Sequence, residues 1–379
     1  MSESHDIAPI AAWQPYRALY IHVPFCKQRC LYCDFATQAC APDDPRLDAY
    51  VDDLVRDIRA ASRAEELGHI ETVYLGGGTP TYLGNARLSR ILYALSLSMH
   101  LTPEVECTLE ANPESLTGAM VRDSFALGAT RISMGVQSFD DDLLRTIGRI
   151  HSADDARRAI ARAQERFENV SIDLMCGLPG QTIAGFERDL DEALALGVKH
   201  VSVYPLMVED GTPLARLVDT GTLAIDEDDG ADYMVVAAER LAAAGMHRYE
   251  VASYAYPGFE SRHNTAYWTG VPYLGLGPGA VSMRQDDLTR ERFEGSHVIE
   301  SLDLFERTAE DLMLGMRMSR GVSDEMVEDA AILLPEAPAA FAELAADGLV
   351  EHRDGRWLPT ERGWLFGNRL YGRLLDLAP

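Results

Sequence analysis

Short apolar runs rich in β-branched residues recur along the chain, and helical patterns separate them. Between the first two runs, for example, residues 45–58 place apolar side chains at three- and four-residue intervals, the spacing of one helix face. Strands that alternate with helices predict a parallel sheet covered by helices. The predicted strands are 18–23, 72–75, 106–109, 131–136, 170–175 and 200–204, with a weaker seventh at 248–253.

This order of elements predicts an α/β fold, namely a partial (β/α)6-type parallel barrel. An open doubly wound sheet is the alternative, because periodicity alone does not separate the two. Near residue 302 the rhythm stops, and helical patterns surround a hairpin with an Asp-Gly turn. These last elements predict a small α+β, winged-helix-like domain. The expected units are a tail at 1–17, a core barrel at 18–250, an extension at 251–300 and a C-terminal domain at 301–379.

Polar and glycine-rich residues are concentrated where the predicted strands end. In β/α barrels the active site lies at the carboxyl ends of the strands. The sequence therefore predicts a site at this rim. The first five strands supply, in order, Cys26, Cys30 and Cys33; Gly76 to Thr81; Glu110 to Pro113; Gln137; and Asp173 with the turn at 177–182.

Three of the six cysteines share one loop, with the spacing C-x3-C-x2-C. Thiolates bind soft metals, and a [4Fe–4S] cluster bound by three cysteines leaves one iron open to a small molecule. Two alternatives remain. Zinc would take a fourth ligand from Cys40 or His22, or the cysteines could be small core residues on one helix face. The thiols of Cys107 and Cys176 lie in apolar strands and are expected in the core.

The formal net charge of −26 disfavours general binding to nucleic acids or to anionic membranes. No apolar run has membrane-spanning length, and the first residues lack the pattern of a signal peptide. Clustered metal-binding cysteines indicate a reducing compartment. We therefore expect a cytoplasmic protein without a nucleic-acid partner.

A histidine, a tyrosine and a tryptophan lie within six residues, at His263, Tyr267 and Trp268. Such a group could form a platform for a flat aromatic ligand, and histidine is a common axial ligand of haem iron. Composition alone favours a simpler interpretation, in which these aromatic rings pack beneath the barrel. The glycine-rich stretch at 273–279 follows and is consistent with close backbone packing.

Taken together, these motifs resemble the oxygen-independent coproporphyrinogen III oxidase family of radical S-adenosylmethionine (SAM) proteins, and within it the HemW branch of haem chaperones. The resemblance extends from about residue 18 to the C-terminus. It implies that Cys26, Cys30 and Cys33 bind a [4Fe–4S] cluster. It implies SAM contacts from Tyr20, Gly77, Gly78, Thr79, Glu110, Gln137, Arg149 and Asp173, and haem contacts from His263, Asn264, Tyr267 and Trp268.

Two features distinguish the branches. The oxidases resemble one another in a C-x3-C-x2-C-x-C motif and in a long preceding segment, whereas here Phe35 takes the place of the fourth cysteine and 25 residues precede Cys26. The resemblance therefore implies haem binding and delivery to haem-dependent respiratory proteins, membrane-associated enzymes included. The alternative is the oxidase, which removes propionate carboxyl groups by radical chemistry. The sequence does not decide whether SAM is cleaved, so enzymatic activity stays open.

Overall fold

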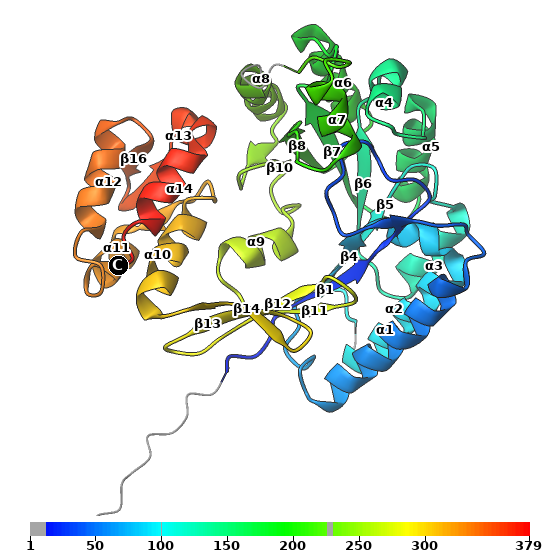
Figure 1. Ribbon diagram of the computed structural model, residues 1–379, viewed down its shortest axis with the longest axis horizontal. Helices are drawn as coiled ribbons and strands as arrows, with labels where there is room; N and C mark the ends of the chain where they lie inside the picture. Colours follow the sequence, from blue (N-terminus) through cyan, green and yellow to red (C-terminus); the bar gives the residue numbers. More distant parts are fainter. Residues whose placement is uncertain (1–12, 100, 226–229) are drawn as a thin grey trace, which may run out of the picture.

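Six parallel strands form a curved sheet that is the centre of the molecule (Figure 1). The computed structural model describes residues 13–99, 101–225 and 230–379. Within these ranges the sheet curves around a concave side without closing (Figure 1), which confirms the expected partial barrel. The strands match the six strong predictions and extend several of them by one or two residues. They are β1 (Ala18–Val23), β4 (Thr72–Gly77), β5 (Glu106–Ala111), β6 (Arg131–Gln137), β7 (Asn169–Cys176) and β8 (His200–Pro205).

The seventh predicted strand, 248–253, is wrong as a continuous element. The chain instead forms two short antiparallel strands, β9 (His247–Arg248) and β10 (Ser253–Ala255), of which β10 pairs with β8. The residues between them make other contacts, since Tyr249 hydrogen bonds to His200 and Glu250 forms a bridge to Met318. Apolar character alone did not reveal this interruption.

Four further strands extend the sheet on the other side of β1 and are absent from the sequence prediction. The first of them pairs with β1 in parallel, and the next three follow as an antiparallel meander. Glycines in the first strand and charged side chains in the later ones hide the apolar alternation on which the prediction depends. They are β11 (Tyr273–Leu276), β12 (Val281–Gln285), β13 (Arg290–Glu294) and β14 (His297–Leu302).

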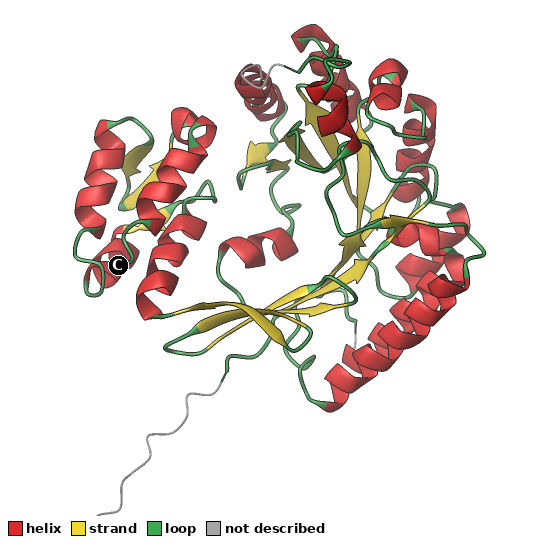
Figure 2. Ribbon diagram, viewed as in Figure 1, coloured by secondary structure: helices red, strands yellow, loops and turns green. Residues whose placement is uncertain are grey.

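Helices cover the outer face of the curved sheet (Figure 2), and the apolar sides of most of them join the strands in one large core. Leu143 and Leu214 belong instead to a smaller apolar cluster. Cys107 and Cys176 are fully buried in this core, as expected. The helices are α1 (Pro45–Arg63), the 3₁₀ turn η1 (Pro80–Leu83), α2 (Asn85–Met99), α3 (Gly118–Ala126), α4 (Asp141–Thr146), α5 (Ala153–Gln164), α6 (Ile183–Ala195), α7 (Pro213–Asp219) and α8 (Gly230–Ala243).

The C-terminal part has a separate core and contains helices and a three-stranded antiparallel sheet, which fits the winged-helix-like expectation. The last helical stretch of the chain is interrupted at Phe366. The elements are α10 (Leu304–Gly315), β15 (Val322–Ser323), α11 (Asp324–Ala331), α12 (Ala337–Ala346), β16 (Val350–Arg353), β17 (Arg356–Pro359), α13 (Glu361–Leu365) and α14 (Gly367–Leu375).

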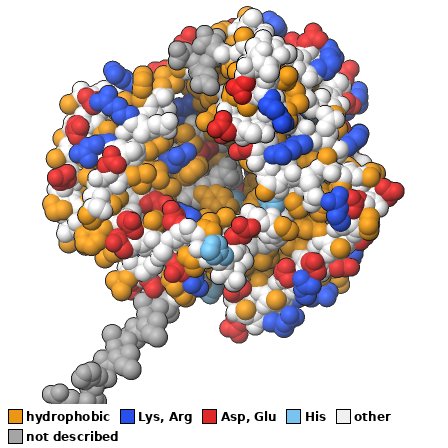
Figure 3. All heavy atoms as spheres, in the orientation of Figure 1, with side chains coloured by type: hydrophobic (Ala, Val, Ile, Leu, Met, Phe, Trp, Pro, Cys, Tyr) orange, Lys and Arg blue, Asp and Glu red, His pale blue; other side chains and the backbone are white. Residues whose placement is uncertain are grey.

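One helix, α9 (Arg262–Trp268), lies on the concave side of the sheet, between it and the C-terminal domain (Figure 1). The carboxylate of Glu106, at the start of β5, accepts hydrogen bonds from the first two backbone N–H groups of α9, each at 3.0 Å. The molecular surface is hollowed in this part of the molecule (Figure 3).

The expected tail at 1–17 is only partly a tail. Residues 1–12 lie outside the described residues, but Gln14 and Arg17 donate backbone hydrogen bonds to Gln285 and Pro272. Among the helices that the structure describes, none has the length and apolar composition needed to span a membrane.

Candidate functional site

The three loop cysteines line one cavity of about 130 Å³ at the carboxyl ends of the parallel strands. Cys26 belongs to the short strand β2 (Phe25–Cys26), which pairs with β3 (Gln38–Ala39) and so fixes the two ends of the loop. All three side chains are partly exposed. The Sγ of Cys26 accepts a hydrogen bond from the Thr79 hydroxyl at 3.5 Å, and burial raises the pKa of its thiol to about 11.

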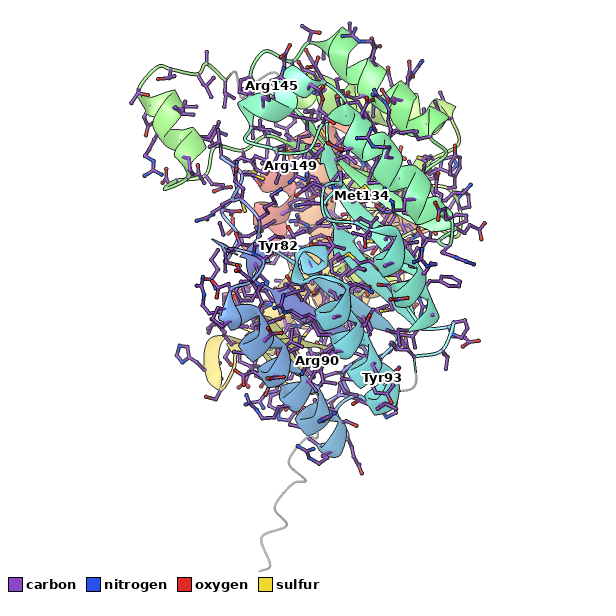
Figure 4. All side chains as sticks on the ribbon, turned by 90° about the vertical axis from the view of Figure 1, so that its right-hand side faces the viewer. Tyr82, Arg90, Tyr93, Met134, Arg145 and Arg149 are labelled. Carbon is purple, nitrogen blue, oxygen red and sulfur yellow. The ribbon has the colours of Figure 1, made fainter. Side chains whose placement is uncertain are left out.

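Arg149 reaches the cysteine loop from the segment after α4, and Figure 4 shows it inward from the exposed Arg145. Its Nη1 donates to the Sγ of Cys30 at 3.5 Å, and its Nη2 donates to the side chain of Asn112 at 2.9 Å and to the carbonyl of Gly135. A Cβ at Gly135 would lie 3.2 Å from Asn112 and 3.4 Å from Arg149, so glycine leaves room for polar side chains to converge.

The glycine turn after β4 packs directly against the start of the cysteine loop. A Cβ at Gly78 would lie 2.7 Å from the carbonyl oxygen of Phe25, which is closer than van der Waals contact allows. Gly77 donates to Glu110, Gly78 to Val23 and Thr79 to Phe25, at 2.7 to 3.1 Å. These N–H groups therefore bond within the protein. What the turn leaves for a ligand is its hydrogen-bond acceptors and a backbone without Cβ atoms, which the ligand can approach closely.

Two carboxylates, Glu110 and Asp173, stand in the same cavity wall. Glu110 accepts hydrogen bonds from the Tyr74 hydroxyl at 2.6 Å and from the Gly77 N–H at 3.1 Å. Burial raises the pKa of Glu110 to about 7 and that of Asp173 to about 6. Gln137 lines the same cavity, and its φ of 70° is a left-handed conformation that is uncommon outside glycine.

A second cavity, of about 300 Å³, adjoins the first and extends into the concave side of the sheet. The two cavities share walls formed by Phe35, Glu110, Gln137 and Asp173 among others. The remaining wall mixes apolar side chains with polar and acidic ones. The apolar ones are Tyr74, Met175, Tyr204, Pro205 and Met207, and the polar ones are Arg131, Ser202, Asn264, Asp34 and Glu209.

All of the predicted SAM-binding residues except Tyr20 line the first cavity. Tyr20 lies outside the lining of both cavities, where its hydroxyl bonds to His22 Nδ1 and its ring stacks on Tyr74. The turn at 177–182 is also outside, because Gln181 hydrogen bonds to the backbone of Leu178 and Met175.

The structure also adds residues that the sequence prediction missed. Asn112 follows Glu110 in the same motif, and Ser133 and Arg131 alternate with Gly135 and Gln137 along β6. Alternate residues of a strand face the same side, so this pattern could have placed Ser133 and Arg131 on the inner face.

The residues of the expected haem-binding segment, 263–268, lie in different environments. His263 is 1% exposed, and both ring nitrogens are hydrogen bonded, Nδ1 to Thr72 at 2.9 Å and Nε2 to Tyr267 at 3.1 Å. Burial lowers its pKa to about 3. In this arrangement both ring nitrogens of His263 bond within the protein, and its contact with haem stays a prediction. Asn264 is the member of the segment that lines the second cavity.

Trp268 faces the C-terminal domain and has no part in the lining of either cavity. Its Nε1 donates to the buried carboxylate of Glu250 at 3.0 Å, and the guanidinium of Arg317 lies 4.5 Å from its ring centre. Tyr267 packs edge-on against Tyr273. The interpretation that these aromatic rings pack beneath the barrel fits this arrangement.

Neither fourth ligand of the zinc alternative lines the cysteine cavity. Both ring nitrogens of His22 are hydrogen bonded, to Tyr20 and to the carbonyl of Ala36, and Cys40 packs against the core. In the ranges that the structure describes, no three His, Cys, Asp or Glu side chains converge on a site for a single metal ion.

Comparisons with known proteins agree with the geometry. Residues 20–193 match the radical SAM superfamily, and residues 302–366 match the HemN C-terminal domain. The heme chaperone HemW of Bacillus subtilis is 32% identical over 95% of this chain and 99% of its own length. That of Mycobacterium tuberculosis strain H37Rv is 36% identical over 98% of each chain.

The solved structure of coproporphyrinogen III oxidase (HemN) from Escherichia coli superposes with a TM-score of 0.79. It covers 95% of this chain and 90% of the other, at 22% identity, which establishes a common fold. The identities to the heme chaperones extend over nearly the whole chain, so this chain belongs to the HemW family of radical SAM proteins.

Proposed function

We propose that this protein binds haem and delivers it to haem-dependent respiratory proteins, and that it carries a SAM-binding [4Fe–4S] cluster. The observation that best supports the choice of function is Phe35, which occupies the position of the oxidases' fourth cysteine. Its side chain is 62% exposed and lines both cavities. An apolar ring there favours a flat apolar ligand over a further thiolate.

The donor set of the first cavity fits an iron–sulfur cluster. Cys26, Cys30 and Cys33 would hold three irons, and the hydroxyl of Thr79 and the guanidinium of Arg149 already point at two of the sulfurs. When bound, the cluster supplies an iron open to the amino and carboxylate groups of SAM. The raised pKa of Cys26 means that its thiolate needs the positive charge of the metal to form near neutral pH.

The surrounding residues then bind and orient SAM. Arg149 can pair with the SAM carboxylate, because its side chain lines the cavity beside the cysteines. Glu110 and Asp173 are suited to accept hydrogen bonds from ribose hydroxyls or from the amino group. Gly77, Gly78 and Thr79 line the cavity at the turn, where the absence of Cβ atoms allows close approach.

The cluster is tested by anaerobic reconstitution with iron and sulfide. We expect brown protein with about four irons and four sulfides per chain, and a Cys30→Ala variant that stays colourless. Cys107→Ala is the matched control, since this thiol is buried in the core away from the cavity. Stoichiometric zinc in place of iron would contradict the proposal.

Haem binding is tested by titration followed through the absorption spectrum. We expect one haem per chain, and an Asn264→Ala variant with weaker binding because Asn264 lines the second cavity. His263→Ala and Trp268→Ala are expected to lose stability, since both side chains bond within the protein. Absence of haem binding by the wild-type protein would leave the oxidase as the remaining candidate.

A further inference from the structure

Arg131, the first residue of β6, carries a buried charge that the fold leaves unpaired. It is 2% exposed, and among the described residues its guanidinium makes no hydrogen bond and no ion pair. Its Nε is fully enclosed without a partner. Burial of an unpaired charge is costly, so such a group calls for an explanation beyond packing.

The other fully buried arginine of the described chain shows the usual solution. Arg290 is 1% exposed and donates to the carboxylates of Glu310, at 2.5 Å, and Asp311, at 2.7 Å. Arg131 has acidic neighbours too. Its positive charge partly offsets the rise that burial causes in the pKa of Glu110 and of Asp173. However, neither carboxylate comes within ion-pair distance, so the donors of Arg131 stay available.

Arg131 lines the second cavity and is absent from the wall of the first. A guanidinium is a planar fork that matches a carboxylate with two parallel hydrogen bonds. The rest of the wall includes the rings of Tyr74 and Tyr204 and the thioethers of Met175 and Met207. The wall also holds four carboxylates, and among its described residues Arg131 is the one cationic side chain that could bind an anion; the carboxylates belong to Asp34, Glu110, Asp173 and Glu209. This combination suits a ligand with a flat apolar body and a carboxylate at one edge.

We infer that Arg131 binds a propionate carboxylate of haem in the second cavity. The inference rests on the proposed haem-binding function and adds where haem binds and which side chain contacts its carboxylate. At about 300 Å³ the cavity is at the small end of ligand sites, so it would receive one edge of the porphyrin. The remainder would lie against Met207 and Tyr204, which are 67% and 42% exposed.

The carboxylate of SAM is the other source of the same chemistry, and the experiment separates the two. Wild-type protein, Arg131→Met and Arg131→Lys are titrated with haem and with haem dimethyl ester, whose propionates carry no charge. SAM is titrated separately into the reconstituted proteins. Arg145→Met is the matched control, because Arg145 lies on the exposed side of α4 (Figure 4) and its removal deletes the same charge.

We expect wild-type protein to bind haem about ten- to a hundredfold more tightly than the diester, the usual effect of a hydrogen bond to a charged group. Arg131→Met should lose this preference, and Arg131→Lys should keep part of it. SAM affinity should stay within about twofold in all variants. Because Arg131 makes no hydrogen bond within the fold, ligand-free Arg131→Met should melt no lower than wild type.

Each failure has its own signature. If wild-type protein binds haem but does not distinguish it from the diester, the inference fails and the haem function stands; this comparison needs no variant. If Arg131→Met keeps the preference and loses SAM affinity, the guanidinium serves SAM instead. If wild-type protein binds neither porphyrin, the proposed function itself fails.

Discussion

Glu110 connects the glycine turn to the wall of the barrel through two hydrogen bonds. Its Oε2 accepts from the Gly77 N–H and its Oε1 from the Tyr74 hydroxyl. Burial and the nearby charge of Asp173 raise its pKa to about 7. Near neutral pH, a small change in proton concentration therefore changes the charge next to the cysteines.

The effect on stability has a definite sign. A carboxyl group whose pKa is higher in the folded state stabilises the fold below its unfolded pKa, and this contribution is lost as pH rises through the folded value. We expect the wild-type free energy of unfolding to fall as pH rises from about 4.5 to about 7, with about 1–3 kcal/mol due to Glu110. Glu110→Gln should remove that part. Urea denaturation at several pH values measures it, and parallel profiles for the two proteins would contradict the assignment.

Asp189 stabilises the backbone directly after Gln137, the residue with the left-handed φ. This buried carboxylate of α6 accepts hydrogen bonds from the Ser138 hydroxyl at 2.8 Å and from the Phe139 N–H at 2.9 Å. We expect Asp189→Ala to lower the free energy of unfolding by about 1.5–3 kcal/mol at pH 7, and to weaken SAM binding by displacing Gln137. Asp191→Ala, on the same helix in an exposed ion pair, is the control and should cost less than about 1 kcal/mol.

At the scale of elements, the turn after β4 packs so tightly against the start of the cysteine loop that the two segments depend on each other for their conformation. Gly78 lies so close to the backbone of Val23 and Phe25 that a side chain there must displace the segment leading to Cys26. We therefore expect Gly78→Ala to lose reconstituted cluster while its helices still form. Iron content and circular dichroism measure the two properties. Gly372→Ala is the control, because a Cβ there meets nothing within 4 Å; full iron content in Gly78→Ala would show that the loop tolerates the displacement.

The sequence predicted the strands that have a regular apolar pattern. It did not predict the strands in which glycines or charged residues interrupt that pattern. The six parallel strands are buried and rich in β-branched residues, so their positions and the polar residues at their ends could be predicted. Strands β11 to β14 carry glycines and charges that serve packing and ion pairs such as Arg290 with Glu310. The surroundings of His263 and Trp268 depend on Thr72 and Glu250, contacts that no local pattern encodes.

At the scale of the whole molecule, the fold is common to chaperone and oxidase, so the choice between them depends on the site. We expect no coproporphyrinogen decarboxylation, because Phe35 stands where the oxidases have a fourth cysteine. Reconstituted protein incubated anaerobically with reductant, SAM and coproporphyrinogen III tests this, with haem titration of the same preparation as the positive control. Protoporphyrinogen formed over many turnovers would assign the protein to the oxidases.

The pairing of β1 with β11 has a consequence for the order of events during synthesis. Residues 18–21 receive one of their two neighbouring strands from residues 273–276, which the ribosome adds roughly 250 residues later. At a synthesis rate of about 5–20 residues per second, that edge of β1 stays unpaired for about 12 to 50 s. An open strand edge invites pairing with other chains, and the cysteine loop follows it directly. During synthesis the chain therefore contains the three cysteines of this loop long before the strand that completes the sheet next to β1.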